Sequence, residues 1–99
     1  MGVRSRSKVT PAQFGLSVTS ATVVTLTVPD GAMCAEIYVR TAPVVYTRDG
    51  TAPTATLGTQ ADLGDVIMLN SRAELDDFKC IAVSTTLTLD VEYFTDISG

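Results

Sequence analysis

The sequence predicts an all-β fold, an antiparallel β-sandwich or jelly-roll-like domain with one short helical turn near residues 72–77. Apolar and polar residues alternate with a period of two over several short runs, which is typical of half-buried strands. Turn-forming residues separate these runs, as at 29–31 and 49–50. No stretch of about 10 to 12 residues has apolar positions at the helical spacing i, i+3, i+4 and i+7. About six or seven short strands in this arrangement favour a sandwich over a helix-rich fold.

Three runs in the first half of the chain have the pattern of strands. We expect strands over residues 22–28, 33–41 and 43–48. Pro43 stands at the first position of the third run, where a missing N–H group is tolerated. In the second run, one face carries Met33, Ala35, Ile37 and Val39, and the opposite face carries Cys34, Glu36, Tyr38 and Arg40.

The second half of the chain contains further strands and the helical turn. Residues 51–58 have the composition of a short, irregular edge strand, and the apolar run Val66 to Leu69 is consistent with a core strand. Ser71 and Glu74 have the spacing of a capping box, which predicts the helical turn. We expect the last strands over residues 78–84 and 87–95. The final run places Leu87, Leu89, Val91 and Tyr93 inward, and Thr88, Asp90 and Glu92 outward.

The distribution of charge divides the chain into a basic arm and an acidic body. Arg4, Arg6 and Lys8 are three of the seven basic residues, whereas residues 9–99 hold four basic and eleven acidic residues. We therefore expect a flexible basic arm over residues 1–11 and a single domain over residues 12–99. The acidic body disfavours nucleic acid as a partner. No apolar run is long enough to cross a membrane, and no apolar segment of a secretory signal follows the basic residues.

The residues that usually carry catalysis are scarce, so we expect no enzyme, no cofactor and no metal site. Histidine is absent, which removes the commonest general base and the usual metal ligand. Cys34 and Cys80 lie 46 positions apart and fit two buried thiols, with a disulfide as the alternative. The acidic pairs, such as Asp76 and Asp77, fit a solvated surface better than a catalytic pair.

The segment VVYTRDGTAPTAT, residues 44–56, resembles the hairpin of chitobiase C-terminal-type β-sandwich modules. The resemblance implies a non-catalytic module that accompanies carbohydrate-active enzymes. Asp49 and Gly50 favour a hairpin turn at this place, and a binding loop is the alternative. We expect any contact made there to be between proteins, with Arg48 taking part.

A longer resemblance covers residues 35–94 and concerns small virion proteins of tailed bacteriophages. The matching residues are Ala35, Glu36, Ile37, Tyr38 and Val39, then Gly64 and Asp65, then Ser71, Glu74, Leu75 and Phe78. The resemblance implies a capsid decoration, or cement, protein, made in the host bacterial cytoplasm and located in the virion. Its implied partner is the major capsid protein, and its implied assembly is a homo-oligomer, most often a trimer. The alternatives are a tail, baseplate or fibre component and a carbohydrate-binding accessory module.

A docking protein of this kind requires a fitted surface, and two parts of the sequence are suited to form one. Glu36, Tyr38 and Arg40 form a mixed polar and aromatic stripe, a composition found at interfaces, although an ordinary solvent-exposed face has the same pattern. The basic arm is the second part, because it has the character of a tether that becomes ordered on binding. The interface residues we expect are Arg4, Arg6, Lys8, Glu36, Tyr38, Arg40 and Arg48.

Overall fold

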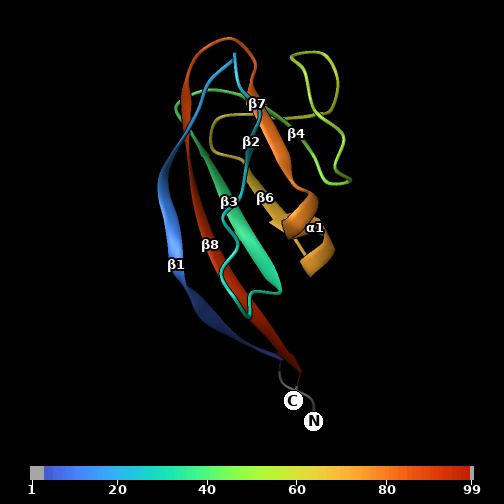
Figure 1. The fold of residues 1–99 in the computed structure, drawn as a ribbon. Helices are drawn as coiled ribbons and strands as arrows, with labels where there is room; N and C mark the ends of the chain where they lie inside the picture. The colour runs from blue at the N-terminus through green and yellow to red at the C-terminus, as the bar shows by residue number, and fades with distance from the viewer. Residues whose placement is uncertain (1–3, 99) are drawn as a thin grey trace.

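The computed structural model describes residues 4–98, and within them the chain forms two packed antiparallel sheets, as the sequence predicts. The first, which we call the long sheet, has the order β1-β8-β3-β6, and the second, the short sheet, has the order β2-β7-β4-β5 (Figure 1). The strands of the long sheet are β1 (Arg4–Val18), β8 (Leu87–Ser98), β3 (Cys34–Arg40) and β6 (Val66–Leu69). Those of the short sheet are β2 (Val24–Thr25), β7 (Lys79–Ala82), β4 (Val44–Thr47) and β5 (Thr59–Ala61).

Strand β1 differs from the sequence prediction, which set residues 1–11 apart as a flexible arm. In the structure, residues 4–11 belong to β1, and residues 4–9 pair with β8 in antiparallel register, from Arg4 opposite Ser98 to Val9 opposite Tyr93. The two long strands run together to the end of the molecule where both termini lie (Figure 1). Pairing with β8 explains the difference, because ladder hydrogen bonds hold a segment that its own composition would leave loose. Residues 1–3 of the predicted arm lie outside the described residues.

The core lies between the two sheets and follows the predicted alternation closely in β3 and β8. Ala35, Ile37 and Val39 of β3 are buried, as are all four predicted inward residues of β8. Met33 is exposed, because it precedes the first residue of β3 and does not share the alternation of that strand. Strand β6 is only half a core strand, since Ile67 and Leu69 are buried whereas its other two side chains are exposed.

Helix α1 (Arg72–Asp77) is the predicted helical turn, and its two ends are fixed by different means. The Ser71 hydroxyl accepts the Glu74 N–H at 3.2 Å, while the Glu74 carboxylate accepts the Asn70 N–H at 2.8 Å. The capping box therefore forms with its carboxylate shifted by one residue. Leu75 and Phe78 then anchor the helix in the core.

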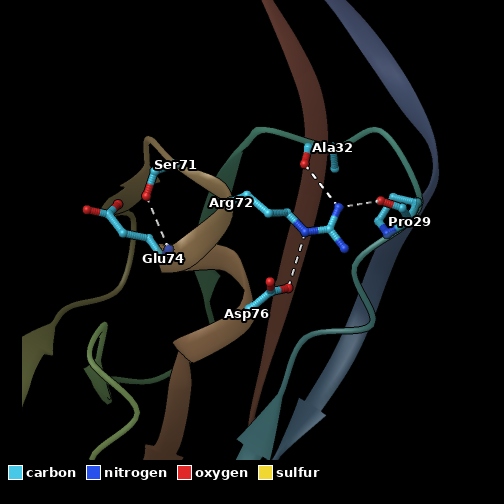
Figure 2. A network of polar contacts seen from close by, with 6 residues as sticks. All are labelled: Pro29, Ala32, Ser71, Arg72, Glu74 and Asp76. Atoms are coloured by element: carbon cyan, nitrogen blue, oxygen red, sulfur yellow. Dashed lines mark hydrogen bonds and ion pairs between the residues drawn. The ribbon is translucent and has the colours of Figure 1, made fainter.

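Arg72, at the start of α1, ties the helix to the loop that precedes β3 (Figure 2). Its Nη1 donates to the carbonyl oxygens of Pro29 and Ala32, at 3.2 Å each, and its Nε lies 3.2 Å from the Asp76 carboxylate. One guanidinium group thus binds two carbonyl groups of this loop, and the Pro29 carbonyl also accepts the Ala32 N–H at 3.2 Å. This contact fixes the chain immediately before β3 enters the long sheet.

Two predicted strands are shorter than expected. Of residues 22–28, only Val24 and Thr25 pair with a neighbouring strand, because the N–H of Thr27 donates to the Gln13 side chain instead of a strand. In the segment 51–58, a single bridge joins Thr54 to Leu57, and the edge strand of the short sheet begins at Thr59. The two cysteines are buried thiols and are not joined in a disulfide, as predicted.

Candidate functional site

The outer face of the long sheet brings together the three residues of the predicted stripe. Glu36, Tyr38 and Arg40 point outward from β3, and β8 places Glu92, Asp90 and Thr88 directly opposite them. We define the polar face by Lys8, Glu36, Tyr38, Arg40, Asp90 and Glu92. The sequence indicated that the β8 residues point outward, but it could not place them beside β3, because about 50 residues separate the two strands.

One half of the polar face is organised around Asp90. Arg40 Nη1 lies 2.8 Å from Asp90 Oδ2, and the Gly15 N–H donates to Asp90 Oδ1 at 2.9 Å. The hydrogen bond from Arg40, with that from Gly15, holds the pKa of the Asp90 carboxyl below its ordinary value. The side chain of Arg40 stays 63% exposed while that of Asp90 is 18% exposed, so a fixed guanidinium group is presented to solvent.

The other half of the face resolves a conflict of like charges. Glu36 and Glu92 stand directly opposite each other on neighbouring strands, an arrangement that is destabilising unless each carboxylate has a partner. The Tyr38 hydroxyl donates to Glu36 Oε1 at 2.6 Å, and Lys8 Nζ lies 2.9 Å from Glu92 Oε2. Lys8 is therefore a residue of the folded sheet, and from β1 it forms an ion pair with Glu92 of β8. Arg4 and Arg6 also belong to β1, but the structure describes only their backbone and not their side chains.

An apolar border adjoins the polar face along β6. Val66 pairs with Tyr38 and Met68 pairs with Glu36, and their side chains are 46% and 37% exposed. The sequence prediction missed this border, because it read residues 66–69 as a strand of the core. A polar and aromatic centre beside exposed apolar side chains is a composition that protein interfaces share.

Arg48 lies apart from the polar face, beside an open pocket of about 570 Å³ on the side of the short sheet. The pocket lies between the end of β4 and the loop that leads to β5, and its lining includes Tyr46, Arg48, Asp49 and Leu57. The Arg48 guanidinium group lies 5.5 Å from the centroid of the Tyr46 ring, and its Nη2 donates to the Tyr46 hydroxyl at 3.3 Å. Phe78 stacks on the same ring with centroids 5.7 Å apart. Tyr46 is only 8% exposed, so its ring is not presented as a platform for a ligand.

The loop that follows β4 is held by its own polar groups. Asp49 Oδ1 accepts the Thr51 N–H at 3.0 Å, which lowers the pKa of the Asp49 carboxyl. The Gly50 N–H donates to the Asp77 carbonyl at 3.1 Å, so the loop is tied to the end of α1. Strands β4 and β5 do form an antiparallel pair, but a loop of eleven residues joins them, and Asp49 and Gly50 make only its first bend.

Among the remaining groups of the described residues, the Cys80 thiol is buried in the core. Burial raises the pKa of the Cys80 thiol to about 12, so at neutral pH the group stays protonated and is a poor nucleophile. Among the side chains of residues 7–95, no three Cys, Asp or Glu residues are grouped to hold a metal ion. No helix in the same part of the chain is long and apolar enough to cross a membrane.

Comparison with protein families, with curated proteins and with solved structures finds no match to this chain.

Proposed function

We propose that this chain is a non-catalytic structural module that docks on a larger protein assembly through the polar face. The observation that carries the proposal is the way in which β3 and β8 present Tyr38 and Arg40. The Tyr38 hydroxyl is bound to Glu36, and the Arg40 guanidinium group is bound to Asp90, so both side chains are fixed before any partner arrives. Fixed side chains lose less conformational entropy on binding than free ones, which favours affinity.

The assembly we propose is the head of a tailed bacteriophage, with the major capsid protein as the partner. The support for this step is the resemblance of residues 35–94 to small virion proteins. Tyr38 and its neighbours in β3 are among the residues that carry this resemblance. A decoration protein works by many modest contacts repeated over the shell, and a small rigid sheet face is suited to such contacts. A tail, baseplate or fibre component would use the same surface at another place in the particle.

The predicted tether has to be tested differently, because its basic residues belong to the paired strand β1. Because Lys8 and its neighbours pair with β8, deletion of residues 2–9 would remove part of a strand as well as three positive charges. Substitution of Lys8 by Ala is a cleaner change, since it keeps the strand and removes only the ion pair with Glu92. If the basic residues assist docking, this variant should bind heads more weakly than the unmodified protein. The difference in binding between the two proteins should be larger at low salt than at high salt, because salt screens the lost charge.

The main test is binding of the purified protein to phage heads assembled without it, measured by co-sedimentation and by the thermal stability of the heads. The variant Tyr38→Ala/Arg40→Ala should lose most of its binding and most of its effect on the heads. Arg48→Ala is the matched control, because it removes an arginine from the opposite side of the domain. Equal binding by the double variant and the unmodified protein would refute docking through the polar face. Loss of binding in Arg48→Ala alone would move the docking surface to the loop pocket.

A further inference from the structure

Strand β6 has one edge without a neighbouring strand among the described residues. The alternation of its hydrogen bonds to β3 shows which backbone N–H and C=O groups point outward from that edge. Within residues 4–98, β6 is the last strand of the long sheet and pairs only with β3. The Val39 N–H donates to the Asp65 carbonyl and the Gly64 N–H donates to the Val39 carbonyl, at 3.0 Å each, which is the pattern of a G1 β-bulge. Hydrogen-bonded and non-hydrogen-bonded pairs alternate from this point along antiparallel strands. Ile67 therefore directs its N–H and C=O to β3, whereas Val66 and Met68 direct theirs away from the sheet.

The side chains at this edge are as unprotected as its backbone. Val66 and Met68 are exposed on the outer face of the sheet, and β6 contains no charged residue and no proline. The opposite edge of the long sheet is built differently, since β1 contains Lys8 and Pro11 and has two breaks in register, before and after Gln13. Charges, proline and bulges are the devices by which sheet edges avoid pairing with other chains. They protect β1 and are absent from β6.

We propose that β6 pairs with β6 of a second copy of this chain, antiparallel and about a two-fold axis at Ile67. This pairing joins two long sheets into one continuous sheet through the β6 strands. The partner is another copy because the edge is complementary to itself. Val66 and Met68 lie symmetrically about Ile67, so placing Val66 opposite Met68 of the second copy satisfies the outward N–H and C=O groups of both residues in both copies.

The same register suits the side chains and the charges. Each exposed Val66 comes to lie beside an exposed Met68, which removes both from water on the outer face. Asp65, the charged residue next to β6, comes to lie opposite Leu69 of the second copy instead of another Asp65. If the register were shifted by two residues in either direction, Val66 would no longer lie opposite Met68 of the second copy.

The seam is short, so it should form a reversible dimer that dissociates on dilution. Stable interfaces bury on the order of 1,600 Å² in total, and pairing between strands of four residues supplies only part of such an area. A two-fold seam closes on itself, so it cannot by itself build the trimer that the virion resemblance implies. The inference does not depend on the proposed function, since it concerns the isolated protein in solution.

The experiment is sedimentation equilibrium of the full chain over a wide range of concentrations, combined with amide hydrogen exchange followed by NMR. The apparent mass should rise from that of the 10.4 kDa monomer to twice this value as the concentration increases. The Val66 and Met68 amides should exchange rapidly in dilute solution and become protected in concentrated solution. The Ile67 amide, which is bonded to β3, should be protected in both.

Three variants separate edge pairing from other association. Met68→Lys adds a charge at the edge, and Met68→Pro removes an outward N–H without breaking the ladder to β3, so both should remain monomeric. Ser17→Lys adds the same charge to β1 at the opposite edge and should associate like the unmodified protein. The proposal is overturned by a monomer at every concentration, by a trimer, by undiminished association of both Met68 variants, or by dissociation of Ser17→Lys. It is also overturned if protection of the Val66 and Met68 amides does not depend on concentration.

Discussion

The hydroxyl group of Tyr93 donates a hydrogen bond to Oε1 of Gln13, joining two residues that lie 80 positions apart in the chain. The same oxygen accepts the N–H of Thr27 at 3.1 Å. Gln13 thus connects β8, β1 and the segment after β2 at the point between the two breaks in the register of β1. Tyr93 is almost completely buried, and its burial raises the pKa of the phenol, so the hydroxyl remains a donor throughout the neutral range.

We expect Gln13→Ala to destabilise the fold more than Tyr93→Phe. The first change leaves a buried hydroxyl and the Thr27 N–H without their acceptor, a loss of about 2 kcal/mol, while the second removes one hydrogen bond, about 1 kcal/mol. Urea denaturation of both variants measures the two differences in the free energy of unfolding. A larger loss in Tyr93→Phe than in Gln13→Ala would show that Gln13 does not connect these segments.

The strands that the sequence predicted well are those whose inward face is set by burial. Leu87, Leu89 and Val91 alternate with polar residues, and one face of β8 must therefore enter the core. Strand β1 escaped prediction because its first half is basic and polar and its second half contains Pro11 and Gly15, which disrupt the period of two. Its pairing with β8 depends on contacts between the two ends of the chain, which local pattern does not report.

The candidate surface was predictable in part for the same reason. The face of β3 that carries Tyr38 and Arg40 followed from alternation alone. That Asp90 would lie beside Arg40 required the strand order, because β8 can pair with several strands without changing its inward face. The exposure of Met68 also depends on strand order, since a strand at the edge of a sheet can leave one apolar face uncovered.

Arg72 and Asp76 form an ion pair, but we expect only the arginine to matter for stability. Arg72→Ala removes the hydrogen bonds to the Pro29 and Ala32 carbonyls and should cost about 1 kcal/mol, because the side chain is partly exposed (Figure 2). Asp76→Ala removes only an exposed i,i+4 pair and should change the free energy of unfolding by less than about 0.5 kcal/mol. Thermal denaturation of the two single variants measures the contrast. Equal losses would mean that Arg72 acts through the ion pair and not through the loop.

Asp90 should make the stability of the fold depend on pH in the acid range. Its pKa is lowered in the folded state by Arg40 and Gly15, so the folded protein prefers the charged carboxylate more than the unfolded chain does. This contribution is present above the unfolded pKa of about 3.9 and is lost as the pH falls through the folded value.

Asp90→Asn tests this dependence, because the amide oxygen can still accept the Gly15 N–H while the charge is removed. The variant should be less stable than the unmodified protein at neutral pH, and the difference should shrink towards zero as the pH falls below about 4. Urea denaturation at a series of pH values provides the measurement. A difference that stays constant with pH would assign the effect of the substitution to packing and not to charge.

Gly58 lies where the loop after β4 returns to the short sheet, and we expect it to tolerate no side chain. Its φ of +129° is outside the region that L residues adopt, and a Cβ atom would lie 2.7 Å from Val45 Cγ1 and 2.9 Å from the Tyr46 carbonyl oxygen. Gly58→Ala should therefore cost more than about 2 kcal/mol and lower the urea midpoint markedly. Gly31→Ala is the matched control, because φ is +86° there but no atom lies within 4 Å of the added Cβ. That control should lose only the backbone term of about 1–2 kcal/mol. Equal losses in the two variants would show that the loop shifts freely, and that the close contact at Gly58 does not hold the loop against β4.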